Sequence, residues 1–311
     1  MQIIFAGSGE FGIPTLRALL EAGHTVVQVI TQPDRPAGRG RVLTPTPIAT
    51  FALDVGLSVI RTEDINTLTL PEADLMIVIA FGQKISPHIV DHARLGSVNL
   101  HASRLPRWRG AAPINWAILA GDATTGNSVI RLAEKMDAGA VLGMTETPIG
   151  DAETAGELHD RLAINGAPLM LRVVEQLQTG KAVEVEQHHS EATLARKLSR
   201  ETSVLDFTRP PVEIARKICG LWPWPGCRVQ LIDPAGKSLA RLHLVRAKVS
   251  NLSPVPTMLT PGTITPVQTV RCGDGHDVEI IEVQPEGKKP MPLAAYVRGN
   301  RWDAGTTLQA V

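Results

Sequence analysis

The chain has 311 residues, enough for two domains, because single hydrophobic cores stop growing at roughly 250 to 300 residues. Hydrophobic residues make up 43% and charged residues 20%, which excludes disorder over most of the length. The 31 Lys and Arg balance 31 Asp and Glu, which excludes a protein that coats nucleic acid by bulk charge. The charge is nevertheless uneven: residues 111–180 hold 4 basic and 9 acidic residues, whereas 205–311 hold 13 and 9.

The first half of the chain alternates strand patterns with helical ones. Apolar runs predict strands at 2–6, 26–30, 57–60, 74–80 and 97–101, and helical patterns lie at 14–21, 48–55 and 87–94. Such alternation is typical of βαβ units on a parallel sheet. Ligands of these sheets bind at the carboxyl ends of the strands, so the loops after Phe5, Ile30, Ala80 and His101 are candidate binding loops.

The second half changes character. Residues 153–177 predict the longest helix, interrupted or kinked near Pro168. A polar stretch follows, and beyond residue 220 short strand-like runs alternate with Gly and Pro turns, which favours a small barrel or sandwich. These runs are 228–232, 242–247, 262–265, 267–271 and 278–283. We therefore expect a catalytic domain at 1–180, a linker at 181–204 and a second domain at 205–311.

Glycines after the first strand fit a dinucleotide-binding pattern. Gly7, Gly9 and Gly12 form G-x-G-x-x-G, and Asp34 follows about twenty residues later. A packing turn explains the same glycines equally well. Pro14 at the start of the helix, and a second strand whose tip carries no acidic residue, count against a nucleotide.

The segment 32–47 is long, aperiodic and basic. Its sequence is QPDRPAGRGRVLTPTP. Loops of this length without secondary structure of their own are usually functional or disordered. Arg35, Arg39 and Arg41 could neutralise phosphates, while the glycines permit close approach to a polymer. Composition alone leaves a solvated flexible loop equally open.

The densest chemical signal lies at the end of the strand predicted at 97–101. Asn99 and His101 are two residues apart and face the same side of a strand. An amide beside an imidazole suits acyl transfer, since one group binds the developing oxyanion while the other moves a proton. Asp137, in a tight turn, is a carboxylate able to orient His101. A purely structural histidine remains the commoner alternative for a strand.

Metal, disulfide and membrane signals are weak. His88 and His92 lie four apart but lack the Glu of a metalloprotease helix, so no metal site is expected. The cysteines have no C-x-x-C spacing, which fits a reducing cytoplasm. The longest apolar run, 75–81, is far shorter than the ~20 residues of a membrane helix. We expect a cytoplasmic protein without a membrane anchor.

Several segments together resemble the family of methionyl-tRNA formyltransferases over nearly the whole chain. They are IIFAGSGEFG at 3–12, TQPDRPAGRGRVLTPTP at 31–47, VNLHASRLPRWRGAAPI at 98–114, MDAG at 136–139, ARKLSRE at 195–201, LWPWPG at 221–226 and QPEGKKPM at 284–291. The Asn-x-His strand, the loop after it and the Asp turn are similar to those of folate-dependent formyltransferases generally. The 31–47 segment and the C-terminal segments are more specific to the tRNA enzymes.

The resemblance implies a Rossmann-like formyltransferase domain with a mostly parallel sheet, followed by an OB-like β-barrel that binds tRNA. It implies transfer of the formyl group of 10-formyltetrahydrofolate to the amino group of methionine on charged initiator tRNA, for translation initiation. Neither a metal nor NAD is implied, and we expect a monomer. The resemblance assigns catalysis to Asn99, His101 and Asp137, the folate site to Ser103, Arg104, Leu105 and Pro106, and tRNA contact to Arg35, Arg39 and Arg41.

The chain departs from the family pattern at three places: Arg104 replaces a usual Leu, Ser8–Gly9 replaces Thr-Pro, and Ser86 replaces Leu. Three rival functions remain open from the residues alone. The first is a formyltransferase for a nucleotide sugar or another small amine, the second is an NAD-linked oxidoreductase built on the glycine motif, and the third is an RNA-binding module with vestigial catalytic residues.

Overall fold

The computed structural model describes residues 1–38, 40–252 and 259–311, and the chain forms two compact units. The N-terminal unit comprises residues 1–110, 125–147 and 159–195. The C-terminal unit comprises residues 111–124, 148–158 and 196–311. Among the residues so described, no helix is both long and apolar enough to span a membrane.

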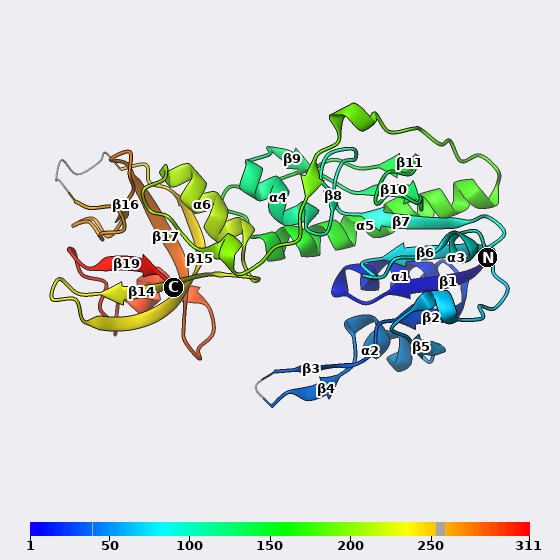
Figure 1. Cartoon of the computed structure of the whole chain (residues 1–311), viewed down its shortest axis with the longest axis horizontal. Coiled ribbons are helices and arrows are strands. Elements are labelled where there is room, and N and C mark those ends of the chain that lie inside the picture. The colour runs from blue at the N-terminus through cyan, green and yellow to red at the C-terminus, as the bar shows by residue number, and fades with distance from the viewer. Residues whose placement is uncertain (39, 253–258) are drawn as a thin grey trace. The chain divides into compact units, whose positions relative to one another are not determined.

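The N-terminal unit is built on a seven-stranded sheet of the order β11-β10-β7-β6-β1-β2-β5 (Figure 1). The five strands from β5 to β7 are parallel, and β10 and β11 are antiparallel to their neighbours, so the predicted mostly parallel sheet is confirmed. The strands are β1 (Gln2–Gly7), β2 (Thr25–Thr31), β5 (Val59–Arg61), β6 (Leu75–Ile79), β7 (Ser97–His101), β10 (Ser128–Arg131) and β11 (Val141–Met144). All of β6, and β1 after the exposed Gln2, are buried, which explains the unbroken apolar runs in their sequences.

Helix α2 (Pro47–Asp54) of this unit begins at a side-chain cap that the sequence supplies. It starts after Thr46, whose hydroxyl accepts a hydrogen bond from the Ala49 amide at 3.1 Å, and Pro47 occupies the first turn. The others are α1 (Ile13–Glu21), α3 (Pro87–Val90), the short 3-10 turns η1 (Glu10–Gly12), η2 (Ile65–Thr67) and η3 (His189–Glu191), and most of α5 (Ala155–Gln178). Helix α5 continues through Pro168 without the predicted interruption.

Two glycines explain close packing around the sheet. A Cβ at Gly7 would lie 2.9 Å from the Ile79 carbonyl oxygen, so the turn after β1 requires glycine for packing against β6. A Cβ at Gly166 would lie 2.7 Å from Leu100, so glycine allows α5 to approach β7 closely. The first of these close approaches favours the packing interpretation of the glycine motif.

The segment 32–47 differs from the aperiodic loop expected from its sequence. Strands β3 (Arg35–Ala37) and β4 (Val42–Thr44) pair in an antiparallel hairpin that projects from the rest of the N-terminal unit (Figure 1). Val42 and Leu43 are each 68% exposed, and all three side chains of β4 are exposed, so burial imposes no apolar alternation on this strand. Its base is fixed by Thr31 and Thr46, whose hydroxyl oxygens are 2.6 Å apart.

The C-terminal unit contains an antiparallel six-stranded sheet of the order β16-β17-β15-β14-β19, with β18 on β17. Its strands are β14 (Cys227–Ile232), β15 (Ser238–Val249), β16 (Val270–Arg271), β17 (Asp277–Pro285), β18 (Met291–Pro292) and β19 (Thr307–Ala310). Register shifts along β15 bend the sheet into a curled half-barrel, which confirms the predicted barrel-type fold. The strand expected at 262–265 is reduced to isolated bridges at Thr263 and Ile264.

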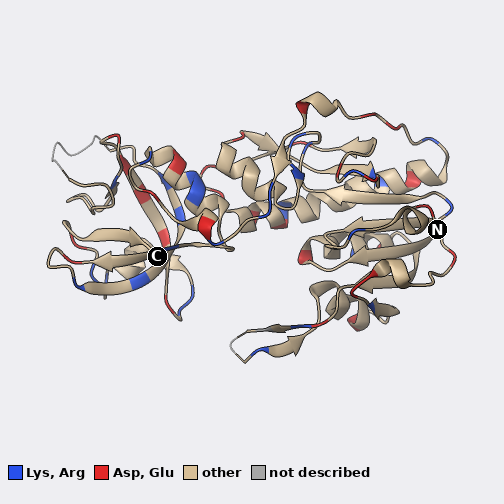
Figure 2. Ribbon diagram, viewed as in Figure 1, with Lys and Arg blue, Asp and Glu red and all other residues tan. Residues whose placement is uncertain are grey.

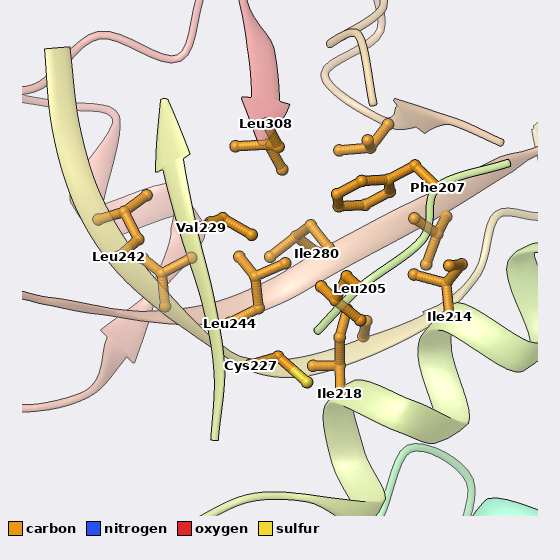
Figure 3. Close-up of a cluster of buried hydrophobic side chains, with 14 of the residues drawn as sticks. Leu205, Phe207, Ile214, Ile218, Cys227, Val229, Leu242, Leu244, Ile280 and Leu308 are labelled. Carbon is orange, nitrogen blue, oxygen red and sulfur yellow. The ribbon is translucent and has the colours of Figure 1, made fainter. Parts of the chain in front are cut away.

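The hydrophobic core of the C-terminal unit lies between this sheet and α6 (Pro211–Gly220) (Figure 3). Ile214 and Ile218 of α6 meet Leu244 of β15 in this cluster, and Ile218 and Leu244 are fully buried. Each such side chain stabilises the fold by about 1.5–3 kcal/mol. The unit also contains α4 (Pro113–Ala120), η4 (Glu201–Ser203) and α7 (Leu293–Tyr296). Elsewhere in the chain, two pairs of short strands remain: β8 (Arg109–Gly110) with β13 (Leu194–Ala195), and β9 (Thr124–Thr125) with β12 (Thr147–Pro148).

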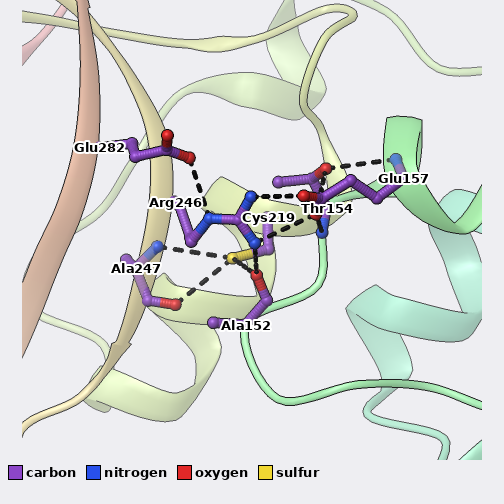
Figure 4. Close-up of polar contacts among 7 residues, drawn as sticks. All are labelled: Ala152, Thr154, Glu157, Cys219, Arg246, Ala247 and Glu282. Atoms are coloured by element: carbon purple, nitrogen blue, oxygen red, sulfur yellow. Dashed lines mark hydrogen bonds and ion pairs between the residues drawn. The ribbon is translucent and has the colours of Figure 1, made fainter. Parts of the chain in front are cut away.

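Arg246 of β15 is the centre of a polar cluster in the C-terminal unit (Figure 4). Its guanidinium donates two hydrogen bonds to Glu157, at 2.6 and 3.0 Å, and one to Glu282 at 2.9 Å. Glu157 also accepts hydrogen bonds from the backbone and hydroxyl of Thr154, both at 2.9 Å, which forms a capping box at the start of α5. The cluster therefore ties β15 and β17 to the first turn of α5.

Replacement of Glu157 by Gln is expected to change stability in a pH-dependent way. Hydrogen bonds from Arg246 and Thr154 lower the pKa of the Glu157 carboxyl from its usual 4.5 to about 2. Because the folded-state pKa is the lower one, the carboxylate stabilises the fold above about pH 4.5, and this stabilisation is lost as the pH falls towards 2. The Glu157 side chain is half exposed, so we expect about 1–2 kcal/mol at neutral pH.

Urea unfolding of the wild type and of Glu157→Gln at pH 7, 5 and 3 measures this effect. The difference in unfolding free energy should be largest at pH 7 and shrink at pH 3. Glu175→Gln, an exposed change on the same helix, is the matched control. A difference that stays constant with pH would contradict the prediction.

Candidate active site

Strand β7 supplies the amide and the imidazole predicted from the sequence. It lies between parallel β6 and antiparallel β10, and His101 is its last residue. Asn99 is half-buried, and His101 is buried with 6% of its surface exposed. Two-residue spacing on one strand directs both side chains to the same face, at the carboxyl edge of the parallel strands.

His101 has a partner on each ring nitrogen. Its Nε2 lies 2.9 Å from the Trp108 carbonyl oxygen, and because a carbonyl can only accept, Nε2 carries a proton and donates it. Its Nδ1 lies 3.7 Å from Asp137 Oδ1, a distance that makes an ion pair when the ring is protonated. The structure thus brings His101 and Asp137 together and leaves Nδ1 as the nitrogen that faces the carboxylate.

Asp137 occupies an unusual backbone conformation. Its φ is +52°, in the left-handed region that a residue with a side chain rarely adopts. Its Oδ2 accepts a hydrogen bond from the Gly110 amide at 2.8 Å, and its carbonyl accepts one from Gln187 Nε2 at 2.9 Å. Such a conformation persists only where the surrounding structure holds it.

The loop after β7 is anchored to β10. The Ser103 carbonyl accepts a hydrogen bond from Ser128 Oγ at 2.7 Å, and the Leu105 amide donates to the same hydroxyl oxygen at 3.1 Å. The Ser103 hydroxyl donates to the Arg107 carbonyl at 2.6 Å. Arg104 points instead to an ion pair with Glu146, so its charge is engaged at the surface.

Leu105 and Pro106 line a groove of about 410 Å³ in the N-terminal unit. Its other walls are β11 and side chains from the segment 183–188, Gln187 among them. The lining is mainly apolar, and a volume of this size is typical of small-molecule sites. The groove can hold a flat, partly apolar ligand beside the anchored loop.

Two of the predicted tRNA-contacting arginines, Arg35 and Arg41, lie in the projecting hairpin, along which Figure 2 shows basic residues. Arg35 is exposed and donates a hydrogen bond to Gln32 Oε1 at 3.1 Å. Arg41 is exposed between β3 and β4, with a φ of +49°. Arg39 lies outside the described residues.

Two polar residues near Asp137 escaped the sequence reasoning. Arg109 is 4% exposed and donates to Gln187 Oε1 from Nε at 3.0 Å and from a terminal nitrogen at 2.6 Å. Gln187 lies in the stretch predicted as a polar linker. The Arg-Gly pair after the loop was visible in the sequence, but nothing there indicated that its partner lay 78 residues later.

Two family models match the chain: Formyl transferase over residues 1–174, and Formyl transferase, C-terminal domain, over residues 197–301. A solved N-formyltransferase from Helicobacter canadensis, in complex with folinic acid and dTDP-3-aminofucose, has the same fold, with a TM-score of 0.64 at 16% identity. That likeness covers 91% of this chain and 98% of the other. The fold and the family models define the class as formyl transferase.

Curated relatives narrow this class. Methionyl-tRNA formyltransferase from Acidobacterium capsulatum is 40% identical over the full length of both chains. The enzyme of the same name from Symbiobacterium thermophilum is 42% identical, over 98% of this chain and 94% of its own. The chain belongs to the methionyl-tRNA formyltransferase family.

Proposed function

We propose that the chain transfers the formyl group of 10-formyltetrahydrofolate to the amino group of methionine on charged initiator tRNA. The product, N-formylmethionyl-tRNA, serves translation initiation, and we expect the enzyme to act as a cytoplasmic monomer. The observation that carries the proposal is the pairing of His101 with Asp137 at the end of β7, in a chain whose full-length relatives bear this name.

Asn99 and His101 would stabilise the charge that develops during transfer. The co-substrate supplies an activated formyl group, and its carbonyl oxygen becomes negative when the methionyl amine attacks the formyl carbon. The Asn99 amide can donate to that oxygen. The Nε2 hydrogen bond to Trp108 fixes the ring of His101, and once the ring is protonated its Nδ1 is the second donor. Preorganised donors of this kind supply a large share of catalysis in acyl transfer.

Asp137 would manage the proton that the amine loses. Its Oδ2 is committed to the Gly110 amide, whereas Oδ1 faces His101. Oδ1 lies 3.7 Å from His101 Nδ1 and can accept a proton from the attacking amine. A bond forms between the amine nitrogen and the formyl carbon, the bond from that carbon to N10 breaks, and N10 gains a proton. The reaction thus balances without a covalent intermediate on the chain.

The anchored loop and the groove support a folate site at Ser103, Arg104, Leu105 and Pro106. Ser128 holds the loop backbone in place, so its main-chain groups can be presented in a fixed geometry. The apolar groove beside Leu105 and Pro106 suits the aromatic part of a folate. Because Arg104 pairs with Glu146, we expect its backbone rather than its guanidinium to serve the ligand.

One assay tests the proposed function. The purified chain is incubated with 10-formyltetrahydrofolate carrying a labelled formyl group and with charged initiator tRNA, and labelled methionyl-tRNA is measured. Free methionine, uncharged tRNA, an amino-sugar nucleotide and NAD are the controls. We expect label on the charged tRNA alone. Labelling of the amino sugar without labelling of the tRNA would instead support the rival sugar formyltransferase.

The hairpin is expected to act on tRNA affinity rather than on chemistry. Replacement of both Arg35 and Arg41 by Ala should raise KM for charged tRNA about tenfold, because each exposed guanidinium can neutralise a phosphate. The slope of log KM against log salt should fall by roughly 0.7–0.9 for each phosphate that is no longer neutralised. Steady-state kinetics at several salt concentrations measure both effects.

Arg172→Ala, at an exposed arginine of α5, is the matched control and should leave the salt slope unchanged. Neither variant should alter KM for the folate. An unchanged salt slope in the hairpin variant would contradict a role of Arg35 and Arg41 in phosphate binding.

A further inference from the structure

The side-chain amide of Gln187 holds the backbone of the turn that contains Asp137. Its side chain is buried, and its Nε2 donates to the carbonyl oxygens of Asp137 and Gly139, at 2.9 and 2.8 Å. Both hydrogens of one amide are therefore used on the two carbonyls that flank Ala138. An amide group in this position fixes the path of the backbone through the turn.

Arg109 determines which way the Gln187 amide faces. Its guanidinium only donates, so the two hydrogen bonds at 3.0 and 2.6 Å require Gln187 Oε1 on the Arg109 side and Nε2 on the Asp137 side. Arg109 also donates to His189 Nδ1 at 2.9 Å. Its backbone amide donates to the Thr193 carbonyl at 2.9 Å, so β8 is held in turn by the segment that carries Gln187.

Two connections lead from Arg109 to Asp137. The first runs from Arg109 through Gln187 to the Asp137 carbonyl. The second runs along the chain from Arg109 to Gly110, whose amide donates to Asp137 Oδ2. A Cβ at Gly110 would lie 2.5 Å from the Ala195 carbonyl oxygen, so glycine is required for this close approach. The carboxylate and the backbone carbonyl of Asp137 are therefore both held by hydrogen bonds that depend on the position of Arg109.

We propose that Gln187, oriented by Arg109, is a positioning residue that keeps Asp137 Oδ1 directed at His101. The inference rests on the proposed function, because it assigns to Gln187 a role that acts through Asp137. Without the Gln187 amide, the carbonyls of Asp137 and Gly139 have no buried donor, and the left-handed backbone of Asp137 is held less firmly. A displacement of about 1 Å in such a group is enough to cost roughly a hundredfold in rate.

The test is a double-mutant cycle of kcat with Gln187→Ala, Asp137→Asn and the double variant. We expect Gln187→Ala to lower kcat by about 10- to 100-fold, with KM for tRNA within about twofold of the wild type. Because Gln187 also lines the groove beside Leu105 and Pro106, KM for folate is measured separately, and kcat is taken at saturating folate. In the Asp137→Asn background, Gln187→Ala should add little further loss, because residues that act through one group are not additive. Gln178→Ala, an exposed change in α5, is the control and should leave kcat unchanged.

Gln187→Glu is the second variant, since it keeps the size of the side chain and the acceptor for Arg109. It replaces the donor to the two carbonyls by an oxygen that can only accept when ionised, so kcat should fall, and the thermal unfolding midpoint is measured beside it. Each variant is assayed well below its own unfolding midpoint, and rates are expressed per folded enzyme.

The outcomes separate the inference from the function on which it rests. Near-normal turnover in Asp137→Asn would remove the proposed role of Asp137 itself. A large loss in Asp137→Asn combined with full kcat in Gln187→Glu would overturn the positioning role. The positioning role would also be overturned if the kcat losses of Gln187→Ala and Asp137→Asn multiplied in the double variant.

Discussion

His101→Ala is expected to lower kcat by about 10²- to 10⁴-fold, the usual contribution of a positioned proton-transfer group. The change removes the imidazole, whose Nδ1 lies 3.7 Å from Asp137 Oδ1. KM for charged tRNA should change little, because the ring is buried and bonded to Trp108 within the N-terminal unit. Single-turnover measurement with saturating folate and tRNA gives the chemical rate directly.

Asp137→Asn should produce a loss of similar size, since an amide keeps the shape of the carboxylate but not its charge. His92→Ala, at an exposed histidine, is the control and should retain full turnover. Near-normal rates in His101→Ala would refute the assignment of the site, whatever the reaction of the chain.

Asp277→Ala is expected to lower the free energy of unfolding by about 3–5 kcal/mol, the typical cost of breaking a buried ion pair by removing one partner. Asp277 Oδ1 lies 2.7 Å from Arg271 Nε, and their side chains are only 4% and 7% exposed. Asp277 also accepts a hydrogen bond from Thr269 at 2.8 Å. The substitution therefore leaves a buried guanidinium and a buried hydroxyl without the carboxylate between β16 and β17.

Urea unfolding of the wild type, Asp277→Ala and the double variant Arg271→Met with Asp277→Leu measures this cost. The double variant should recover much of the stability, because the buried guanidinium is removed together with the carboxylate. A cost below about 1 kcal/mol in Asp277→Ala would mean that water reaches the pair, as it does in exposed salt bridges.

The sequence predicted the elements whose burial is complete. Strand β6 throughout, and β1 after the exposed Gln2, are apolar because both faces of the sheet are covered, and such runs can be recognised without tertiary information. Strands β10 and β11 were missed, since each has four residues and mixes glycine or polar side chains with apolar ones. The β3–β4 hairpin was missed for a different reason: its exposed side chains carry no signal of a buried face.

Only part of the candidate site could be predicted from the sequence. The period of a strand placed Asn99 beside His101, but the approach of Asp137 to His101 depends on the tertiary fold. Arg109 was not singled out because a buried arginine is rare, and its identification requires a buried partner. That partner, Gln187, lies in a polar stretch without periodicity, where composition predicts a solvated linker.

The C-terminal unit is assembled from three separate stretches of chain, so no single continuous fragment of residues 205–311 contains all of it. Within the unit, Asn115 and Trp116 of α4 donate to the carbonyls of Gly220 and Arg196, and Glu157 reaches Arg246. A fragment that began at residue 205 would lack α4 and Glu157, and the surfaces they cover would meet solvent. Proteolytic nicking between 196 and 204 should therefore leave two pieces that remain associated without a covalent link, and an isolated barrel would need the missing stretches supplied as peptides.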